Sequence, residues 1–489
     1  MVEVNTIKNT ERKKVAGNTV FYLIYQCILF VVPLLVMPYL TRILSESSLG
    51  EYSFSYSIAY YFVLASNLGI SIYGQREIAS IKDDKEKLKR KFWSLFYVHA
   101  SFSIIAFAAY LCFVFFTKST NIYLFIIPYV ISAFFDVTWF FYGLEDFKLV
   151  TLVNGLFAIV KMALIFIFVR NNDSLWIYQL ISFGAILLSQ LSIFGLAIKN
   201  VGKPVKVNAK ECLRHLKPIL YFALATIALT LYTYVDKTLL GVMVNDSKKS
   251  IAYYECADKL VAVPRTLITV LGIVLYPKMC SFVASDQKSK VMDYTLFSID
   301  WTSFLSFGAI FGLLALAAPF SGLYYGESYV VSGYCMMLMS PLIFIISLGS
   351  ICRTQYILPQ KRDKVFLLSL TFNALTNVLL NVLLIPLLGV YGVIVASIVS
   401  ESVGLAYQLI ACRNQFPFKY ALKSSLFHLF GGFCMFIIVY GCSKVLIPDS
   451  WVKVVVLFVI GLVSYVLLIN LSSSVFSHRN LLSRSKGVN

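Results

Sequence analysis

The sequence predicts an all-α polytopic membrane protein with about 14 transmembrane helices. The chain of 489 residues is 59% hydrophobic and only 13% charged, and its mean hydropathy of +0.79 lies outside the range of soluble globular domains. Apolar runs of about 20 residues recur along the whole chain, and each is long enough to cross roughly 30 Å of hydrocarbon as a helix. The short alternating strands of a membrane barrel are absent from the sequence.

The predicted spans follow one another with short connections, none longer than roughly 20 residues, which leaves no room for a separate soluble catalytic domain. Each span is an apolar run bounded by polar or charged residues. In chain order the spans are Gly17 to Leu40, Tyr52 to Tyr73, Trp93 to Phe116, Ile122 to Tyr142, Leu149 to Val169, Leu175 to Ile198, Pro218 to Val242, Ile251 to Tyr276, Phe297 to Pro319, Tyr329 to Ile351, Val365 to Leu387, Val390 to Ala411, Ser425 to Leu446 and Trp451 to Leu471.

Basic residues predict the orientation of these spans. Segment 8–14 is basic and precedes the first span, which has no cleavage pattern after it and is expected to be retained. With this end in the cytoplasm, about 31 of the 42 Lys and Arg lie in cytoplasmic segments, chiefly Gly74 to Lys91 and Lys199 to Lys217. An even number of spans returns the C-terminus to the same side. The net charge of +18 therefore indicates attraction to anionic lipid heads, and we expect no binding of nucleic acid.

No motif for bond-breaking chemistry or for a cofactor occurs in the sequence. The ten cysteines lie mostly inside spans without a CxxC pair, and the four histidines are scattered. There is no converging Ser/His/Asp set, no P-loop and no DxD sugar-nucleotide motif. We therefore expect no catalytic residues, no metal, no cofactor and no enzymatic activity.

The cytoplasmic segment after the sixth span divides the chain into two similar halves. Spans one to six and seven to twelve run in the same direction, as in transporters with parallel repeats. The fifth helix of each copy is marked by Asn, at Asn154 in one and around Asn377 in the other. The predicted domains are an N-terminal lobe of residues 1–200, a C-terminal lobe of residues 201–414, and residues 415–489 with helices 13 and 14 and a cytoplasmic tail.

Charged residues inside the predicted spans point to a functional interior. A charge at the centre of a bilayer costs about 2.5 to 3.5 kcal/mol on insertion scales, so these side chains must face one another or a hydrated interior. They are Asp136, Lys161, Asp236, Lys237, Glu255, Asp258, Lys259, Arg265 and Glu401.

The eighth span carries two potential ion pairs. Glu255 and Lys259 are four residues apart, in the order that favours a helical pair. Asp258 and Arg265 are seven apart and share another face, and Arg265 lies near mid-membrane after Pro264, which loosens the helix locally. For Arg265, polyanion binding and a structural ion pair both stay open.

The other charged candidates are more isolated. Lys161 has no acid within two turns of its helix, and a substrate contact or snorkelling towards the outer surface would explain it. Glu401 is alone at mid-span and is a candidate ion or proton site. Arg42, at the outer end of the first helix, is either a rim residue or a substrate contact. Lys237 is a weaker candidate because Asp236 adjoins it.

The stretch DVTWFFYGLEDFKLV raises the question of why an acid precedes a run of aromatic residues. Asp136, Trp139, Phe140 and Gly143 are spaced as one helical face near the cytoplasmic end of the fourth span, and Trp139 suits the membrane interface. Asp136 then either packs or caps this end of the span, or it couples an ion.

Three stretches resemble the signatures of a known family. They are VMPYLTRILSESSLGEYSFSYSI (Val36 to Ile58), DVTWFFYGLEDFKLV (Asp136 to Val150) and LIPLLGVYGVIVASIVSE (Leu384 to Glu401). In this order they resemble those of Wzx-type flippases, the polysaccharide export branch of the multidrug/oligosaccharidyl-lipid/polysaccharide (MOP) exporter superfamily. The resemblance extends over essentially the whole chain, although Tyr142 stands where the family motif usually has Gln.

The resemblance implies a fold of two six-helix lobes around a central cavity, plus two C-terminal helices. It also implies transport of undecaprenyl-pyrophosphate-linked oligosaccharide repeat units from the inner to the outer leaflet of the bacterial cytoplasmic membrane, for O-antigen, lipopolysaccharide or capsule synthesis. A polysaccharide polymerase and a chain-length regulator are the protein partners that this role suggests.

The resemblance also suggests roles for individual residues. Cationic cavity residues bind the anionic substrate in this family, and by position these are Arg42, Lys161, Lys237, Lys259 and Arg265. Alternating access would be coupled to a cation gradient through a carboxylate at Asp136, Asp258 or Glu401.

Other functions stay open at this point. A flippase for lipid-linked peptidoglycan precursor needs the same chemistry, whereas a drug/cation antiporter of the same superfamily would need acids without the cationic set. A polytopic glycosyltransferase or polymerase needs an acidic motif on a large outer loop, and outer loops such as NDSKKS are short. A scaffold for envelope assembly would not need a deep Lys161.

Overall fold

The computed structural model describes residues 28, 31–81, 83–117, 120–244, 246–445 and 450–475. Helices make up the regular structure of these residues, and no strand occurs among them. The basic segment before the first predicted span, most of that span and most of the C-terminal tail lie outside the described residues.

By their contacts the helices form two compact units, Met1–Ala252 (unit 1) and Tyr253–Asn489 (unit 2). The division falls inside one helix, α11 (Ser247–Ala284), so the chain passes from one unit to the other without a linker. Helix α10 (Ala209–Met243), which is the predicted seventh span, packs on α2, α3 and α4 of unit 1. The division into two lobes and a C-terminal part stays a prediction.

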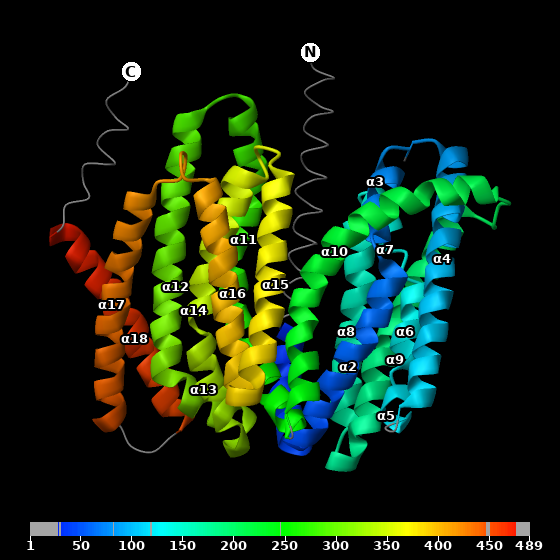
Figure 1. Ribbon diagram of the computed structural model, residues 1–489. Coiled ribbons are helices and arrows are strands. Elements are labelled where there is room, and N and C mark those ends of the chain that lie inside the picture. Colours follow the sequence, from blue (N-terminus) through cyan, green and yellow to red (C-terminus); the bar gives the residue numbers. More distant parts are fainter. Residues whose placement is uncertain are drawn as a thin grey trace. The chain divides into compact units, whose positions relative to one another are not determined.

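Unit 1 contains nine α-helices of very different length within its described residues, besides a short apolar helix at Val31–Ile43 (Figure 1). The nine, with one short 3-10 helix, are α2 (Glu46–Asn67), α3 (Ile70–Ala79), α4 (Lys85–Phe116), α5 (Thr120–Leu124), α6 (Ile127–Phe134), α7 (Thr138–Gly143), α8 (Phe147–Phe168), η1 (Asn172–Ser174), α9 (Leu175–Val201) and α10. Two apolar clusters hold this bundle together, one around Trp93 and Phe140 and the other around Tyr110 and Tyr129.

The start and the end of α2 are both determined by local chemistry. Ser45 accepts a hydrogen bond from the N–H of Ser48 and so caps the first turn. The helix ends at Leu68, whose φ of 24° lies outside the helical region. Gly69 follows, and a Cβ there would lie 2.3 Å from the carbonyl oxygen of Ile219 on α10. Only glycine therefore allows α10 to cross α2 at this point.

The predicted fourth span is interrupted. The stretch Asn121–Gly143 is long and apolar enough to cross a membrane, but it consists of α5, α6 and α7, with a break between Phe134 and Thr138. The prediction that Asp136 continues one helical face with Trp139 is therefore wrong, because Asp136 lies in the break. Trp139 is also only 1% exposed and stacks on Phe92, so it belongs to the core and not to the membrane interface.

Unit 2 takes up most of α11 and the helices after it. These are α12 (Lys288–Tyr325), η2 (Glu327–Tyr329), α13 (Val330–Met339), α14 (Pro341–Ile351), the π-helix η3 (Cys352–Ile357), α15 (Asp363–Leu388), α16 (Val390–Ala411), α17 (Phe418–Val445) and α18 (Trp451–Val475). The predicted tenth span is bent by 41° between Met339 and Pro341. Proline at this position removes a helical hydrogen bond, which explains the bend.

Helices α15 and α16 are joined by buried amides. Gln408 of α16 donates to Ser369 of α15 at 3.1 Å, and within α15 Asn381 donates to Asn377 at 3.0 Å. Asn377 also lies 3.5 Å from the hydroxyl of Ser397. Such side chains hold membrane helices together where apolar packing alone distinguishes poorly between helices and lipid. The Asn residues that mark the predicted repeat are thus packing residues in this half.

Ten of the described helical stretches are long and apolar enough to cross a membrane, or up to 11 if the bent pair Glu327–Met339 and Pro341–Ile357 is one span. The chain is therefore an all-α polytopic membrane protein. Helices α2 and α10 are not among the ten, and their Ser, Tyr and charged residues explain why.

Candidate functional site

A row of tyrosines on α2 packs on α9 and α10 within unit 1. Tyr52, Tyr56 and Tyr60 are four residues apart, so they share one side of the helix. The Tyr60 ring stacks on Tyr234 of α10 with the two ring centroids 3.9 Å apart, and Tyr56 meets the same ring edge-on. The contact between α2 and α10 therefore combines apolar ring faces with hydroxyl groups inside a membrane helix bundle.

Lys237, one of the predicted substrate residues, lies at this contact. Its side chain is 9% exposed, and its Nζ is 5.8 Å from the centroid of the Tyr234 ring, which is the range of a cation–π interaction. Asp236 beside it is 3% exposed, and both residues take part in further polar interactions. In this conformation Lys237 is thus held by the protein, and a substrate would have to displace its present partners.

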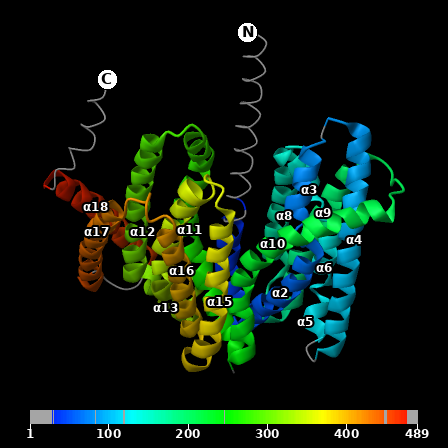
Figure 2. The ribbon, with the colours of Figure 1, turned by 45° about the horizontal axis from the view of Figure 1, so that its top comes forward.

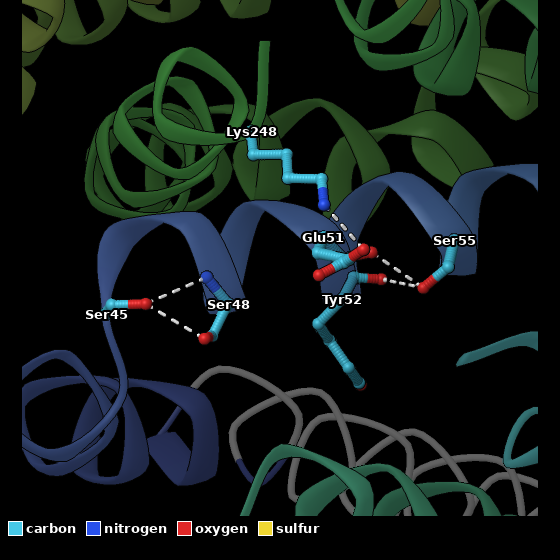
Figure 3. A network of polar contacts seen from close by, with 6 residues as sticks. All are labelled: Ser45, Ser48, Glu51, Tyr52, Ser55 and Lys248. Carbon is cyan, nitrogen blue, oxygen red and sulfur yellow. Dashed lines mark hydrogen bonds and ion pairs between the residues drawn. The ribbon is translucent and has the colours of Figure 1, made fainter. Parts of the chain in front are cut away.

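A polar network joins the start of α2 to two other segments of unit 1, and Figure 3 shows its bonds within α2 and to Lys248. Glu51 Oε1 lies 2.7 Å from Nζ of Lys248 in the first turn of α11. Ser48, whose N–H is bound by Ser45, donates its hydroxyl to Asn172 Oδ1 at 2.9 Å. The network therefore ties the starts of α2, η1 and α11 together at the end of unit 1 that is predicted to face outward.

Gly50 lets the backbones of α2 and α11 touch beside this ion pair. A Cβ on Gly50 would lie 1.6 Å from the carbonyl oxygen of Lys248, so no other residue fits without separating the helices. The sequence analysis assigned no role to Gly50, Glu51 or Lys248. Glu51 and Lys248 are 197 positions apart, and a single sequence gives no signal for such a contact.

Helix α11 carries the predicted charged face, and this part of it belongs to unit 2. The predicted Glu255–Lys259 pair is present, with 3.0 Å between Oε1 and Nζ. The predicted Asp258–Arg265 pair is also present, with 3.6 Å between Arg265 Nη2 and Asp258 Oδ1. The four side chains are between 15% and 38% exposed. The face is therefore polar and accessible, but its formal charges cancel.

The remaining predicted cations lie on separate helices of unit 1. Arg42 is exposed at the end of the Val31–Ile43 helix, and its Nη1 donates to the carbonyl oxygen of Pro38 at 2.6 Å. Lys161 is partly buried on α8 and interacts with another group. Lys161 is therefore not an isolated lysine, although its own helix offers it no acid.

The predicted carboxylates differ in their surroundings. Asp136 Oδ1 accepts hydrogen bonds from the N–H and the hydroxyl of Thr138, at 3.1 and 2.7 Å, and so closes a local turn just before α7, whose cap residue is Val137. Asp258 is paired with Arg265 as described. Glu401 is partly buried on α16 and makes no hydrogen bond or ion pair with any other described residue.

One carboxylate was missed by the sequence analysis. Asp300 on α12 accepts hydrogen bonds from the hydroxyls of Ser424, at 2.6 Å, and Tyr420, both on α17. Asp300 lies inside the predicted ninth span, so it could have been counted with the other charged residues of the spans. In the part of the chain that the structure describes, no three His, Cys, Asp or Glu side chains gather as a metal site.

Comparisons with known proteins agree with this architecture. A putative O-antigen transporter of Shigella dysenteriae is 23% identical over 393 residues, which cover 78% of this chain and 96% of that protein. A putative O-antigen transporter of Escherichia coli is also 23% identical, over 414 residues, with 83% and 98% covered. The structure of the lipid II flippase MurJ in an inward closed conformation matches with a TM-score of 0.74 at 17% identity, and covers 94% of this chain and 100% of that one.

The family model described as polysaccharide biosynthesis protein matches residues 15–283. This range extends from the first predicted span through the end of α11, and so includes the tyrosine row, the Glu51–Lys248 network and the charged face of α11. The match spans more than half of the chain, and the chain therefore belongs to this family of polysaccharide biosynthesis proteins.

Proposed function

We propose that this protein is a flippase that moves undecaprenyl-pyrophosphate-linked oligosaccharide repeat units from the inner to the outer leaflet of the bacterial cytoplasmic membrane. Support comes from the family match and from the two relatives named as putative O-antigen transporters, which the alignments cover almost end to end. A non-enzymatic transporter with 14 spans, in two six-helix lobes plus two C-terminal helices and with both termini in the cytoplasm, is part of this proposal.

The charged face of α11 is the observation that carries the proposal. A hydrated oligosaccharide with two phosphates cannot enter hydrocarbon, so its carrier must offer polar groups at membrane depth. Two ion pairs, partly exposed, occur within a helix that is otherwise apolar enough to cross a membrane. Four such charges facing lipid would be strongly unfavourable, whereas they are compatible with a hydrated path.

Arg265 is the best candidate for contact with the pyrophosphate. Its guanidinium can donate two parallel hydrogen bonds to a phosphate, and its distance of 3.6 Å from Asp258 is longer than a charge-assisted hydrogen bond. Arg265 can therefore exchange Asp258 for an anionic substrate. Lys259 is held at 3.0 Å by Glu255 and is the weaker candidate on this helix. Arg42, Lys161 and Lys237 are proposed as further substrate contacts.

Glu401 is the best candidate for the coupling carboxylate. It has no partner among the described residues, whereas Asp258 is paired with Arg265 and Asp136 is bonded to Thr138. A carboxylate that is partly buried and unpaired can bind a proton or a sodium ion without first breaking another contact. Coupling to a cation gradient by alternating access, and cooperation with a polymerase and a chain-length regulator, are further parts of the proposal.

Reconstitution tests the proposal directly. The purified protein in vesicles should move a fluorescent undecaprenyl-pyrophosphate oligosaccharide to the opposite leaflet, measured by its accessibility to an added quencher. Lipid-linked peptidoglycan precursor serves as the competing substrate. Movement of neither lipid would contradict the flippase assignment, and preference for the peptidoglycan precursor would favour the second function.

A double-variant comparison separates the two roles of Arg265. If Arg265 only neutralises Asp258, Arg265→Ala should lose transport, and the double variant Arg265→Ala/Asp258→Ala should regain it. If Arg265 binds the substrate, both of these variants should lose transport, whereas Asp258→Ala alone should retain it. The same measurement on Glu255→Ala/Lys259→Ala, the neighbouring pair on α11, shows whether loss of any ion pair from this helix has the same effect.

A further inference from the structure

A hollow of about 540 Å³ lies at one end of unit 1, where α3, α4 and α10 meet. Figures 1 and 2 show α3, the start of α4 and the start of α10 at this end of unit 1, away from the start of α2. The residues that line the hollow are Tyr73, Arg90, Lys91, Asn208, Lys210, Glu211, Arg214 and His215. They come from the two longest segments that the charge pattern predicts to be cytoplasmic, and from residues beside them.

The lining is strongly basic. It contains four cationic side chains and one carboxylate, that of Glu211, so its net charge is +3 with His215 neutral. Arg90 donates to Glu211 Oε2 from Nε at 3.0 Å and from Nη2 at 2.9 Å, which joins α4 to α10 across the hollow. Lys91 pairs with Glu77 at 3.0 Å. These pairs use the cations of α4 and leave those of α10.

Lys210 and Arg214 are the cations of α10. They are four residues apart and lie on one face of the helix. Neither side chain makes an ion pair or hydrogen bond with another described residue. Two cations on one wall of a basic hollow favour an anionic ligand, because no ion pair with the described protein offsets the repulsion between them.

Two further features of the same hollow favour an anion. The 35-residue helix α10 begins here, and its cap residue Asn208 lines the hollow, so the positive end of the helix dipole is directed at it. His215 is 4% exposed, and its Nδ1 is bonded to the Tyr73 hydroxyl at 2.8 Å, while its Nε2 has no hydrogen-bond partner. A buried ring nitrogen without a partner is costly unless a ligand satisfies it.

We propose that this hollow binds a phosphate group on the predicted cytoplasmic side of the membrane. Arginine and lysine side chains together with a helix N-terminus are the groups that bind phosphate in proteins. The phosphate can be the headgroup of an anionic membrane lipid or a soluble phosphate compound, since both present the same oxygens. The site is separate from the charged face of α11 and does not depend on the transported substrate.

Binding to the purified full-length protein in neutral detergent tests the proposal. The probes are inorganic pyrophosphate, measured by titration calorimetry, and short-chain phosphatidic acid, measured by native mass spectrometry against phosphatidylcholine. We expect at least one phosphate probe to bind, and Lys210→Gln/Arg214→Gln to weaken it about tenfold or more. If phosphatidic acid binds and pyrophosphate does not displace it, the ligand is a lipid. If pyrophosphate binds and phosphatidic acid does not displace it, the ligand is a soluble phosphate compound.

The matched control is Lys203→Gln/Lys206→Gln. These two exposed lysines belong to the same predicted cytoplasmic segment but do not line the hollow, and the variant removes the same charge. Its affinity should equal that of the wild type, and all variants should keep the wild-type melting temperature. Equal weakening by both double variants, or binding of neither phosphate probe to the wild type, would overturn the proposal.

Discussion

The Lys248 ammonium lies 2.7 Å from a carboxylate oxygen of Glu51, although the two residues are 197 positions apart. The pair connects the first turn of α11 to the beginning of α2, where Gly50 allows the two backbones to touch. The two side chains are 49% and 22% exposed, so the ion pair contributes less than about 1 kcal/mol to stability. The close approach of the backbones is the more demanding part of the contact.

Gly50→Ala should therefore destabilise the protein by roughly 1 to 3 kcal/mol, because the new methyl group overlaps the Lys248 carbonyl. Glu51→Gln should destabilise the protein less than Gly50→Ala does. Thermal unfolding in detergent measures the stability of both variants. Gly184→Ala on α9 is the control, since no atom lies within 4 Å of the added Cβ and alanine favours a helix. An equal loss at Gly50 and Gly184 would contradict the assignment.

The sequence alone predicted the helical membrane class because each span carries its own signal in composition. The same local rule predicted the Glu255–Lys259 pair, whose partners lie one turn apart on one helix. The break before Thr138 was not predicted, because the apolar run continues through it and the bonds between Asp136 and Thr138 are visible only in the folded chain. The sequence pattern therefore predicted where the spans lie better than it predicted the breaks inside them.

Candidate residues for a site could be chosen from the sequence, but their contacts could be predicted less well. A charge in an apolar span is visible in the sequence, so Lys237 and Arg265 could be proposed as candidates. The partners Tyr234 and Asp258 lie on the same helices as Lys237 and Arg265, but the stacking of Tyr234 on Tyr60 of α2 joins segments that are close only in the folded chain. The Glu51–Lys248 contact was missed for the same reason.

Asp136 allows a structural role and ion coupling to be distinguished. Asp136→Asn keeps a side-chain oxygen that can accept from Thr138, so stability should be nearly unchanged, whereas Asp136→Ala should lose about 1 kcal/mol. If Asp136 only holds the turn before α7, Asp136→Asn should also retain transport in the vesicle assay. A stable Asp136→Asn protein without transport would show that the charge itself is needed.

Asp300 should be essential for the docking of α17 on α12. Asp300→Ala leaves the hydroxyls of Ser424 and Tyr420 without their acceptor, and unsatisfied buried groups cost about 1 to 3 kcal/mol. Asp293→Ala is the control on the same helix, because Asp293 is exposed and makes no hydrogen bond or ion pair with another described residue. The two melting temperatures should differ by several degrees, and similar values would contradict the role of Asp300.

His215 should make stability depend on pH in the weakly acidic range. Burial lowers the pKa of His215 below its usual value of 6.5, and the nearby charge of Lys91 lowers this pKa further. The charges of Glu77 and Glu211 raise it, and Tyr73 is a neutral neighbour of the ring. Below pH 6.5 the unfolded chain therefore binds a proton that the folded protein does not, so the free energy of unfolding falls as the pH decreases from 6.5 towards the lowered pKa. Above pH 6.5 this contribution is constant. His215→Asn should show a smaller loss of melting temperature between about pH 7 and pH 5.5, and parallel curves for the two proteins would refute the argument.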